Sequence, residues 1–386
     1  MYSIDLDGAQ LLLGYTDVFS SEIPNLKEEI EKLNMHKAIS IISELIRIRD
    51  AKLDPIQVFG KEIKIPFETV LKKRICEIDM GEPGEFFSNS MLNKNVHIIS
   101  VQMLLLLLKK VILHGNHKTI ECSEYEISWD DYEKIIQLQL IVAEDINQKH
   151  AQEINADHFL YSTYHLNYER NVANEILRMY YIMEKLSVNK NLFEVDVQKE
   201  YRDYYKAFID KYGFSPKQYI SSLFFELDNY YAGINGLTYA PIWKSSESIY
   251  GHLKAKQDIV EVIGTLSQTT EHHIKWVSES ENQEWDFSGF FEFPFITDQK
   301  GNHLSICDMT LRNAFFEKIF WLIRDCYPKT DSRAMAFFGR LFEKYIQDVT
   351  RDAINGYYNF IEEFSYKEKK KSKKSSDAYI RKGKDW

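Results

Sequence analysis

The sequence is poor in the two residues that most often interrupt helices. Its 386 residues include only 8 Pro and 16 Gly, and both residue types mark turns and helix ends. A chain with so few of them is expected to form long helices joined by simple loops. The 24 Tyr and 24 Phe add large apolar side chains that can fill a core. The composition therefore predicts a mainly helical, globular protein.

Cysteine is also scarce. The four cysteines are Cys76, Cys122, Cys307 and Cys326; none belongs to a C-x-x-C pair, so a zinc ribbon is not expected. Scattered cysteines of this kind are typical of reduced thiols inside the cell. The N-terminus shows no basic segment followed by an apolar one, which is the pattern of a secretory signal. We therefore expect a cytoplasmic protein.

A long uninterrupted hydrophobic run is missing as well. The most apolar stretch, IISVQMLLLLLKKVILHG, ends at Gly115 and contains Ser100, Gln102, Lys109 and Lys110. A membrane-spanning helix needs about 20 predominantly apolar residues. The stretch therefore predicts a buried core helix that ends at Gly115, and the sequence predicts no membrane partner.

Several familiar catalytic motifs do not occur. The sequence contains no Walker A loop, no G-x-G-x-x-G, no H-E-x-x-H and no G-x-S-x-G. P-loop nucleotide hydrolysis and serine-hydrolase chemistry therefore have no support. One helical stretch places four residues of metal-ligating type near one face, which could bind a metal, although such residues more often form the solvated side of a helix; they are His150, Glu153, Asp157 and His158. The adjacent His272 and His273 are expected to point apart.

Charge is unevenly distributed. The chain carries a net charge of −10, but the last twenty residues hold nine Lys and Arg against three Asp and Glu, a local charge of +6. The preceding residues therefore carry −16. An acidic body with a basic end suits a protein whose nucleic-acid contact is confined to that end. The body itself is expected to contact protein, either a partner or another copy.

Local signals indicate where elements begin and end. Ser128 with Asp131 predicts the N-cap of a helix, Gly213 predicts a helix end, and Ser215 followed by Pro216 predicts a new helix start. Residues 285–308 alternate around a turn at Asp298–Gly301 and predict a β-hairpin.

These patterns divide the chain into three predicted parts. We expect a multi-helical body at residues 1–235, used for interaction or sensing, and a mixed hairpin and helix connector at residues 236–330. A distinct C-terminal unit is expected at residues 331–386.

The C-terminal unit begins with an amphipathic helix, SRAMAFFGRLFEKYIQDVTRDAI, in which Glu343 lies beside the apolar face. YNFIEEFSYKEKK then reads as a strand with a charged end, followed by a Lys-Ser turn. The final SSDAYIRKGKDW predicts a strand that carries Asp377, a glycine turn, and the start of another strand.

This order resembles the first half of the PD-(D/E)XK nuclease core. The resemblance lies in FFGRLFEKYI and SSDAYI and covers about 55 residues of the 386. It implies the start of an α/β restriction-endonuclease-like domain. It also implies a metal-dependent nuclease that cuts phosphodiester bonds and serves as an anti-phage defence or restriction effector.

Carried over residue by residue, the resemblance implies Asp377 as a ligand of Mg²⁺ and Glu343 as a supporting acidic residue. The metal would neutralise charge on the phosphate. In the family an E-x-K strand follows the Asp-bearing strand, and none follows Asp377 within these 386 residues. As a 386-residue chain the protein is therefore expected to be inactive, and to cut nucleic acid only if the chain continues beyond Trp386.

The basic end predicts contacts with phosphate groups, with DNA favoured over RNA. The expected contact residues are Lys370, Lys371, Lys373, Lys374, Lys382 and Lys384. An alternative interpretation is a non-enzymatic helical scaffold or sensor subunit with a basic tail, in which Asp377 is a turn residue.

Overall fold

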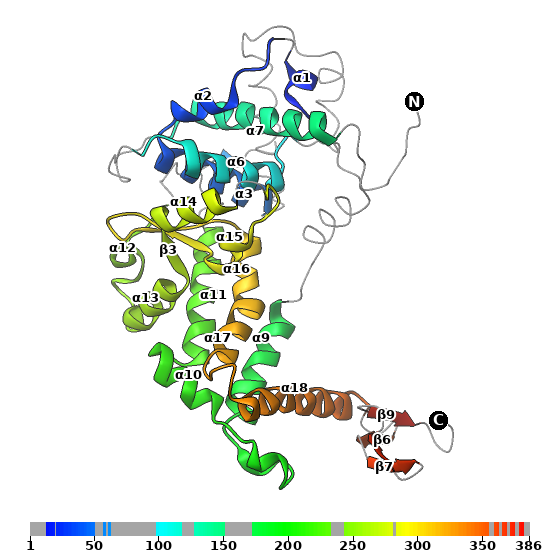
Figure 1. The fold of residues 1–386 in the computed structure, drawn as a ribbon. Coiled ribbons are helices and arrows are strands. Elements are labelled where there is room, and N and C mark those ends of the chain that lie inside the picture. The colour runs from blue at the N-terminus through cyan, green and yellow to red at the C-terminus, as the bar shows by residue number, and fades with distance from the viewer. Residues whose placement is uncertain are drawn as a thin grey trace. The chain divides into compact units, whose positions relative to one another are not determined.

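A computed structural model describes most of the chain. The described residues are 13–19, 21–50, 57–58, 61–62, 98–117, 127–150, 172–232, 243–280 and 283–354, together with four short strands between residues 359 and 381. The protein is mainly helical, as the composition predicts (Figure 1). Its residues form two compact units, Met1–Glu169 with Ser222–Ala314, and Arg170–Ser221 with Phe315–Trp386.

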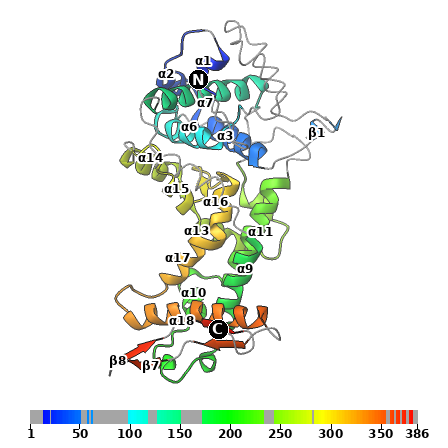
Figure 2. The ribbon, with the colours of Figure 1, turned by 90° about the vertical axis from the view of Figure 1, so that its right-hand side faces the viewer.

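The first unit contains a helical layer in which three long helices pack on one another (Figures 1 and 2). They are α3 (Met35–Asp50), α6 (Val101–His114) and α7 (Trp129–His150), with the short α1 (Tyr15–Val18) and α2 (Leu26–Glu31) beside them. Leu104, Leu107 and Leu108 of α6 are fully buried. A helix that is apolar on nearly every side must lie inside a core, which confirms the predicted core helix. A short antiparallel pair, β1 (Gln57–Val58) with β2 (Lys61–Glu62), also belongs to this unit.

The ends of α6 and α7 follow the local sequence. The Ser100 side chain accepts a hydrogen bond from the Met103 amide, and Gly115 follows the last residue of α6. At the start of α7 the Ser128 amide donates to Asp131 Oδ2 at 2.8 Å, and the Asp131 amide donates back to Ser128 Oγ at 3.4 Å. This reciprocal pair satisfies amides that have no partner within the helix, and it confirms the predicted cap.

The rest of the first unit surrounds a small sheet of β3 (Ser267–Thr269), β4 (Phe295–Thr297) and β5 (His303–Ser305). The strands β4 and β5 form a hairpin around the predicted turn, in which Gly301 adopts a positive φ of 79°. The predicted extent of 285–308 is wrong, because residues 288–292 form the helix α15. The parallel pairing of β3 with β4 was not predicted. Three residues are too few to show a strand period, and parallel pairing depends on the crossover through α14.

Two helices, α13 (Lys256–Thr265) and α14 (Thr270–Glu279), contact this sheet. The unit also contains α12 (Ser246–Tyr250), α15 (Ser288–Glu292), α16 (Asp308–Asn313) and, from Ser222 onward, α11 (Pro216–Ala232). Within α14 His272 is exposed and His273 fully buried, which confirms that the two rings point apart.

The second unit is also helical. Its helices are α9 (Val172–Tyr181), α10 (Tyr204–Tyr212), α17 (Ile319–Arg324) and α18 (Ser332–Ala353). A π-helical turn follows α9 (Ile182–Leu186), and another leads into α17 (Ala314–Lys318). Two 3-10 turns lie between α9 and α10, at Lys190–Leu192 and Val197–Lys199. Gly213 ends α10 with φ 83°, and Ser215 Oγ accepts from the Gln218 amide at 3.2 Å, so both predicted signals are confirmed.

Aromatic rings form the core of the second unit. The ring centroids of Phe193 and Phe337 are 5.0 Å apart, and those of Tyr204 and Phe338 are 5.3 Å apart. Phe208 is fully buried beside them. Such rings bury large areas and favour tilted and edge-to-face contacts, so the high Tyr and Phe content is used here to build a compact core.

After α18 the chain forms two antiparallel ladders, β6 (Asn359–Glu362) with β9 (Ala378–Arg381), and β7 (Ser365–Glu368) with β8 (Lys371–Lys374). A single strand followed by a Lys-Ser turn was the prediction for this stretch, and it is wrong, because residues 371–374 form β8. Charge does not prevent a strand whose backbone has a partner, and Glu368 stands directly opposite Lys371 in this ladder. Two residues separate β6 from β7, and three separate β8 from β9. The connection from β8 to β9 is therefore one residue longer than the connection from β6 to β7.

The predicted boundaries between parts of the chain, near residues 235 and 330, stay a prediction. The restriction-endonuclease-like core likewise stays a prediction. Within the described ranges, no helix has the length and apolar character needed to cross a membrane.

Candidate functional site

The helix that carries Glu343 is firmly held at its N-terminus. Asp331 accepts hydrogen bonds from the Arg333 and Ala334 amides at 3.1 and 3.0 Å. It also accepts from Arg202 Nε and Nη2 at 3.2 and 3.1 Å. These contacts, the Ala334 amide first, hold the pKa of Asp331 below its usual range. The Tyr204 hydroxyl donates to the Ala334 carbonyl at 2.7 Å, so three side-chain groups fix the first turn of α18.

Glu343 lies on the exposed side of α18. Its side chain is 47% exposed, and Arg340 Nη1 donates to Glu343 Oε2 at 2.6 Å. The opposite side of the helix buries Phe337, Phe338 and Leu341. A surface carboxylate already paired with an arginine is a poor metal ligand by itself.

The other predicted site residues lie in or beside the C-terminal strands. Asp377 immediately precedes β9 in the sequence and is itself outside the described residues. Lys371, Lys373 and Lys374 belong to the backbone of β8. The predicted residues outside the described part are Lys370, Lys382, Lys384, Glu153, Asp157 and His158, and the side chain of His150.

The described part of the chain brings together no group of three or more His, Cys, Asp and Glu side chains of the kind that holds a metal ion. The residues placed here therefore do not make a Mg²⁺ site. A Mg²⁺ site would have to include Asp377 and further ligands from outside the described residues.

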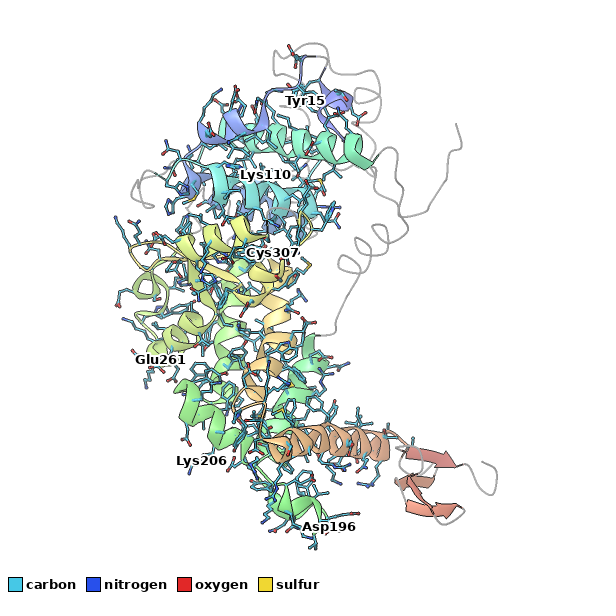
Figure 3. The ribbon with its side chains drawn as sticks, viewed as in Figure 1. Tyr15, Lys110, Asp196, Lys206, Glu261 and Cys307 are labelled. Carbon is cyan, nitrogen blue, oxygen red and sulfur yellow. The ribbon has the colours of Figure 1, made fainter. Side chains whose placement is uncertain are left out.

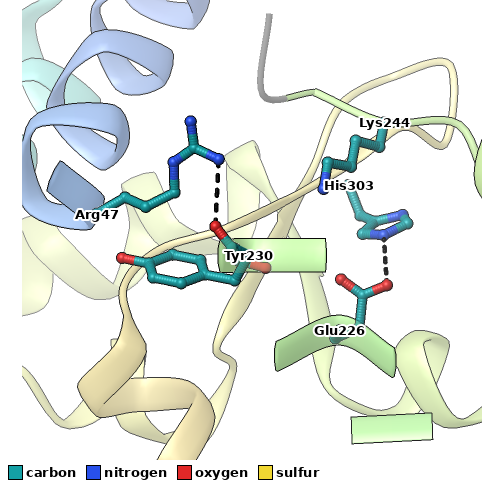
Figure 4. Close-up of a pocket in the computed structure, with 6 residues that line it drawn as sticks. Arg47, Glu226, Tyr230, Lys244 and His303 are labelled. Atoms are coloured by element: carbon teal, nitrogen blue, oxygen red, sulfur yellow. Dashed lines mark hydrogen bonds and ion pairs between the residues drawn. The ribbon is translucent and has the colours of Figure 1, made fainter. Parts of the chain in front are cut away.

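A buried polar cluster in the first unit was not found from the sequence (Figure 4). Arg47 comes from α3, Glu226 and Tyr230 from α11, and His303 from β5. Lys244 precedes α12, and its backbone exchanges two 2.9 Å hydrogen bonds with the backbone of His303. No local pattern joins these residues, because they meet only through the packing of separate elements.

Glu226 and His303 form the centre of the cluster. Their exposed fractions are 1% and 2%, and His303 Nε2 lies 3.6 Å from Glu226 Oε1, too far for a hydrogen bond. Neither Glu226 Oε1 nor His303 Nε2 has a hydrogen-bond partner among the described residues. The His303 ring lies parallel to Tyr250 with centroids 6.3 Å apart.

Two basic side chains, Arg47 and Lys244, line the same cavity as Glu226 and His303. Arg47 Nη1 donates to the Tyr230 carbonyl at 3.2 Å, and its guanidinium is ion-paired with the buried Glu44. Lys244 Nζ donates to the Asn229 carbonyl at 3.4 Å, and burial lowers the pKa of Lys244 below its usual range.

The cavity between these groups has a volume of about 10 Å³. That is room for about one water molecule, so the cluster cannot hold a substrate. The cluster joins side chains of α3, α11 and β5 around this cavity.

The described geometry thus contains a well-anchored helix, a pair of antiparallel strands beside Asp377, and a buried structural cluster. None of these alone identifies the reaction or the family. Comparison with protein-family models, with curated proteins and with solved structures finds no match to this chain.

Proposed function

We propose that the C-terminal part contacts nucleic acid as part of a metal-dependent nuclease, with the helical body making protein contacts. The observation that carries this proposal is the pairing of β9 with β6 directly after α18. Along the chain the helix comes first, then β6, then the β7–β8 pair, and then β9, so β6 and the strand that follows Asp377 keep the order of the resemblance with a second ladder between them. Asp377 adjoins the second strand of that pair.

Charge supports the same proposal. Three of the four residues of β8 are lysines, and the last twenty residues carry +6. Lysines bind phosphate through charge and displace counterions, so this contact is independent of base sequence and sensitive to salt. The charge of −16 on the preceding residues repels nucleic acid, which would confine the contact to this end.

Hydrolysis in the resembled family also requires an E-x-K strand that follows the aspartate. By the resemblance, Asp377 contributes one metal ligand, and the E-x-K strand contributes another carboxylate and the lysine. We therefore assign nucleic-acid binding, without cleavage, to the 386-residue chain. Cleavage is proposed for the protein that also contains an E-x-K strand.

Binding is tested with fluorescein-labelled DNA and RNA duplexes and anisotropy at several KCl concentrations. We expect the 386-residue chain to bind, and the triple change Lys371→Gln, Lys373→Gln and Lys374→Gln to weaken binding about tenfold or more at 50 mM salt. Because each phosphate contact contributes about 0.9 to the slope of log K against log salt, the slope should fall by up to about 3.

The matched control changes three exposed lysines of the second unit, Lys185, Lys190 and Lys206, to Gln. Equal weakening by both triple variants means that binding follows net charge and is not located in β8. No measurable binding by the unaltered chain overturns the proposal.

Cleavage is tested on supercoiled plasmid with Mg²⁺, using the protein expressed from its complete reading frame. Asp377→Ala should abolish nicking, because the removed carboxylate is the proposed metal ligand. The control Asp352→Asn alters an exposed carboxylate at the end of α18 and should leave nicking unchanged. If Asp377→Ala cuts as well as the unaltered protein, Asp377 has no catalytic role.

One observation favours the scaffold alternative. The second unit exposes large apolar side chains on two helices, including Leu177 at 64%, Ile346 at 55% and Val349 at 46%. Clustered exposed apolar side chains often mark protein contacts. In that case the chain self-associates in sedimentation velocity, Ile346→Ser with Val349→Ser lowers the sedimentation coefficient, and salt-dependent nucleic-acid binding is not observed.

A further inference from the structure

Helix α14 is attached to the rest of the first unit by few buried side chains. It contacts β3, β4 and α6, and the buried side chains among its ten residues are Thr270, His273 and Val277. Ile274 and Trp276 are partly buried. By comparison, nine residues of α6 are buried. Because packing of an apolar face supplies most of the stability of a helix in a protein, the attachment of α14 depends strongly on the burial of its histidine.

The His273 side chain lies among aromatic rings. Its ring centroid is 5.8 Å from that of Phe290 on α15 and 6.3 Å from that of Trp276 on α14. Its polar contact is with the backbone of Phe295 on β4. These surroundings suit a neutral imidazole. For a protonated imidazole, aromatic rings offset only part of the hydration that is lost on burial.

The charged groups on the surrounding elements give little support to a protonated His273. On the same helix, the charge of His272 acts against that of His273. On α6 the Lys109 ammonium lies 5.4 Å from the centroid of the Trp276 ring. The strands β3 and β4 contain no charged residue. The remaining acidic residues of α14 and α15 are all exposed, and they are Glu271, Glu279 and Glu292. The remaining basic residues of α6 and α14 are Lys110, which Figure 3 labels, His114 and Lys275.

Burial, with His272 as the second cause, lowers the pKa of His273 from 6.5 to about 4. Separation of α14 would expose the ring to water and restore its ordinary pKa, so the separated form binds more protons. The attachment is therefore fully stable above pH 6.5 and weakens as the pH falls toward 4. Burial also lowers the pKa of His36 on α3, although Asp298 and Glu271 act against it, so His36 contributes in the same direction.

The second unit lacks this source of acid sensitivity. All eleven histidines of the chain lie in the sequence ranges of the first unit, and none occurs in residues 170–221 or 315–386. Carboxyl groups have ordinary pKa values near 4, and hydrogen bonds from the Ala334 amide and Arg202 hold the pKa of Asp331 lower still. Few groups of the second unit therefore change charge between pH 7 and pH 5.

We propose that α14 is a pH-sensitive switch: in mild acid His273 takes up a proton from water and α14 separates from β3, β4 and α6, while the second unit stays folded. The step binds one proton at a ring nitrogen and breaks no covalent bond. The inference does not depend on the nuclease proposal, since α14 belongs to the first unit.

Hydrogen exchange of the 386-residue chain at pH 7 and pH 5 tests the switch. Protection factors, corrected for intrinsic exchange at each pH, report how often each helix opens. Because the pKa of His273 is about 4 when buried and 6.5 when exposed, the protection of α14 should fall about twentyfold between pH 7 and pH 5. The protection of α7 in the first unit, and of α10 and α18 in the second, should change by less than about threefold.

Two variants assign the effect to a residue. His273→Phe keeps an aromatic ring that cannot bind a proton, so the fall in the protection of α14 should disappear. His252→Phe removes an exposed histidine outside α14 and should retain the full fall. Circular dichroism at pH 7 establishes that each variant is folded. If His273→Phe does not fold, the comparison of α14 with α7, α10 and α18 in the unaltered chain still decides.

Unchanged protection of α14 between pH 7 and pH 5 overturns the proposal. An equal fall in α7 would show that the first unit opens as a whole, and an equal fall in α10 and α18 would show that acid acts on both units. Either result removes α14 as a separate switch. The full fall in a folded His273→Phe variant would assign the acid sensitivity to another group and would also overturn the proposal.

Discussion

At the scale of single residues, His273 is a fully buried imidazole whose polar contact is with the backbone of Phe295. Its ring packs among aromatic neighbours, with centroids 5.8 Å from Phe290 and 6.3 Å from Trp276. Burial is the main cause that lowers its pKa to about 4, with the neighbouring His272 adding to the effect. The folded protein therefore keeps this side chain neutral at pH values where a free histidine takes up a proton.

This predicts a loss of stability in acid. The pKa of His273 is about 4 when folded and 6.5 when unfolded, so the unfolded chain binds more protons between these values. The stability is fully present above pH 6.5 and falls as the pH drops toward 4, by up to about 3 kcal/mol. Urea unfolding at pH 7, 5.5 and 4.5 measures it.

His273→Phe should reduce this pH dependence, because a phenylalanine cannot bind a proton and fits the same aromatic surroundings. The free energy of unfolding at pH 7 should not fall by more than about 1 kcal/mol, since the substitution removes a single contact, with the Phe295 backbone. The exposed His252→Phe is the control. An unchanged slope in His273→Phe would show that another group causes the acid sensitivity.

Lys109 is a second buried residue with a defined role. It is 5% exposed, and its ammonium donates to the carbonyls of Gln283 and Asp286 at 2.9 Å each and of Glu284 at 3.3 Å. It also lies 5.4 Å from the centroid of the Trp276 ring. The charge that interrupts the apolar helix thus binds the segment at residues 283–286 to the core.

We predict that Lys109→Met lowers the free energy of unfolding by about 3 kcal/mol. The methionine fills the apolar part of the space but leaves three carbonyls without their charged donor, and each such bond contributes about 1.5–3 kcal/mol before compensation by water. Urea denaturation measures it, with the exposed Lys254→Met as control. A change below about 0.5 kcal/mol would mean that water replaces the ammonium without cost.

At the scale of elements, α18 is held by its first turn and its buried aromatic side. The Tyr204 hydroxyl and the Asp331 carboxylate both act on that turn, and burial is the first cause that raises the pKa of Tyr204. The next element along the chain after α18 is β6.

Tyr204→Phe should therefore destabilise the second unit by about 1–2 kcal/mol, because it leaves the Ala334 carbonyl without its donor. Chemical denaturation followed by near-ultraviolet circular dichroism measures the change. Tyr180→Phe, at a side chain 38% exposed, should have no comparable effect. If Tyr204→Phe is neutral, the hydroxyl does not anchor the helix.

At the scale of the whole molecule, the two compact units have cores of different character. The first is built around Leu- and Ile-rich α3, α6 and α7, and the second around tyrosine and phenylalanine rings. Each unit contains the buried contacts on which its own stability depends.

We therefore expect differential scanning calorimetry to resolve two transitions. Lys109→Met should lower the temperature of one transition, and Tyr204→Phe should lower the other. If each substitution shifts a single common transition, the two units unfold as one cooperative body.

The sequence predicted the elements whose signals are local. The caps at Ser128 and Ser215, the helix end at Gly213 and the hairpin around Gly301 were all found, because each depends on residues within a few positions. The strand β8 was missed since a run of lysines has no apolar alternation, and only its pairing with β7 makes it a strand.

Composition and short-range pattern by themselves determined that this protein is mainly helical, where several of its helices begin and end, and that its C-terminal end is basic. Only the tertiary structure decided that Lys109 binds three carbonyls and that Glu226 meets His303. The physical reason is distance along the chain. Helix caps and turns are stabilised by neighbouring residues, whereas these sites exist only after elements far apart in sequence have packed together.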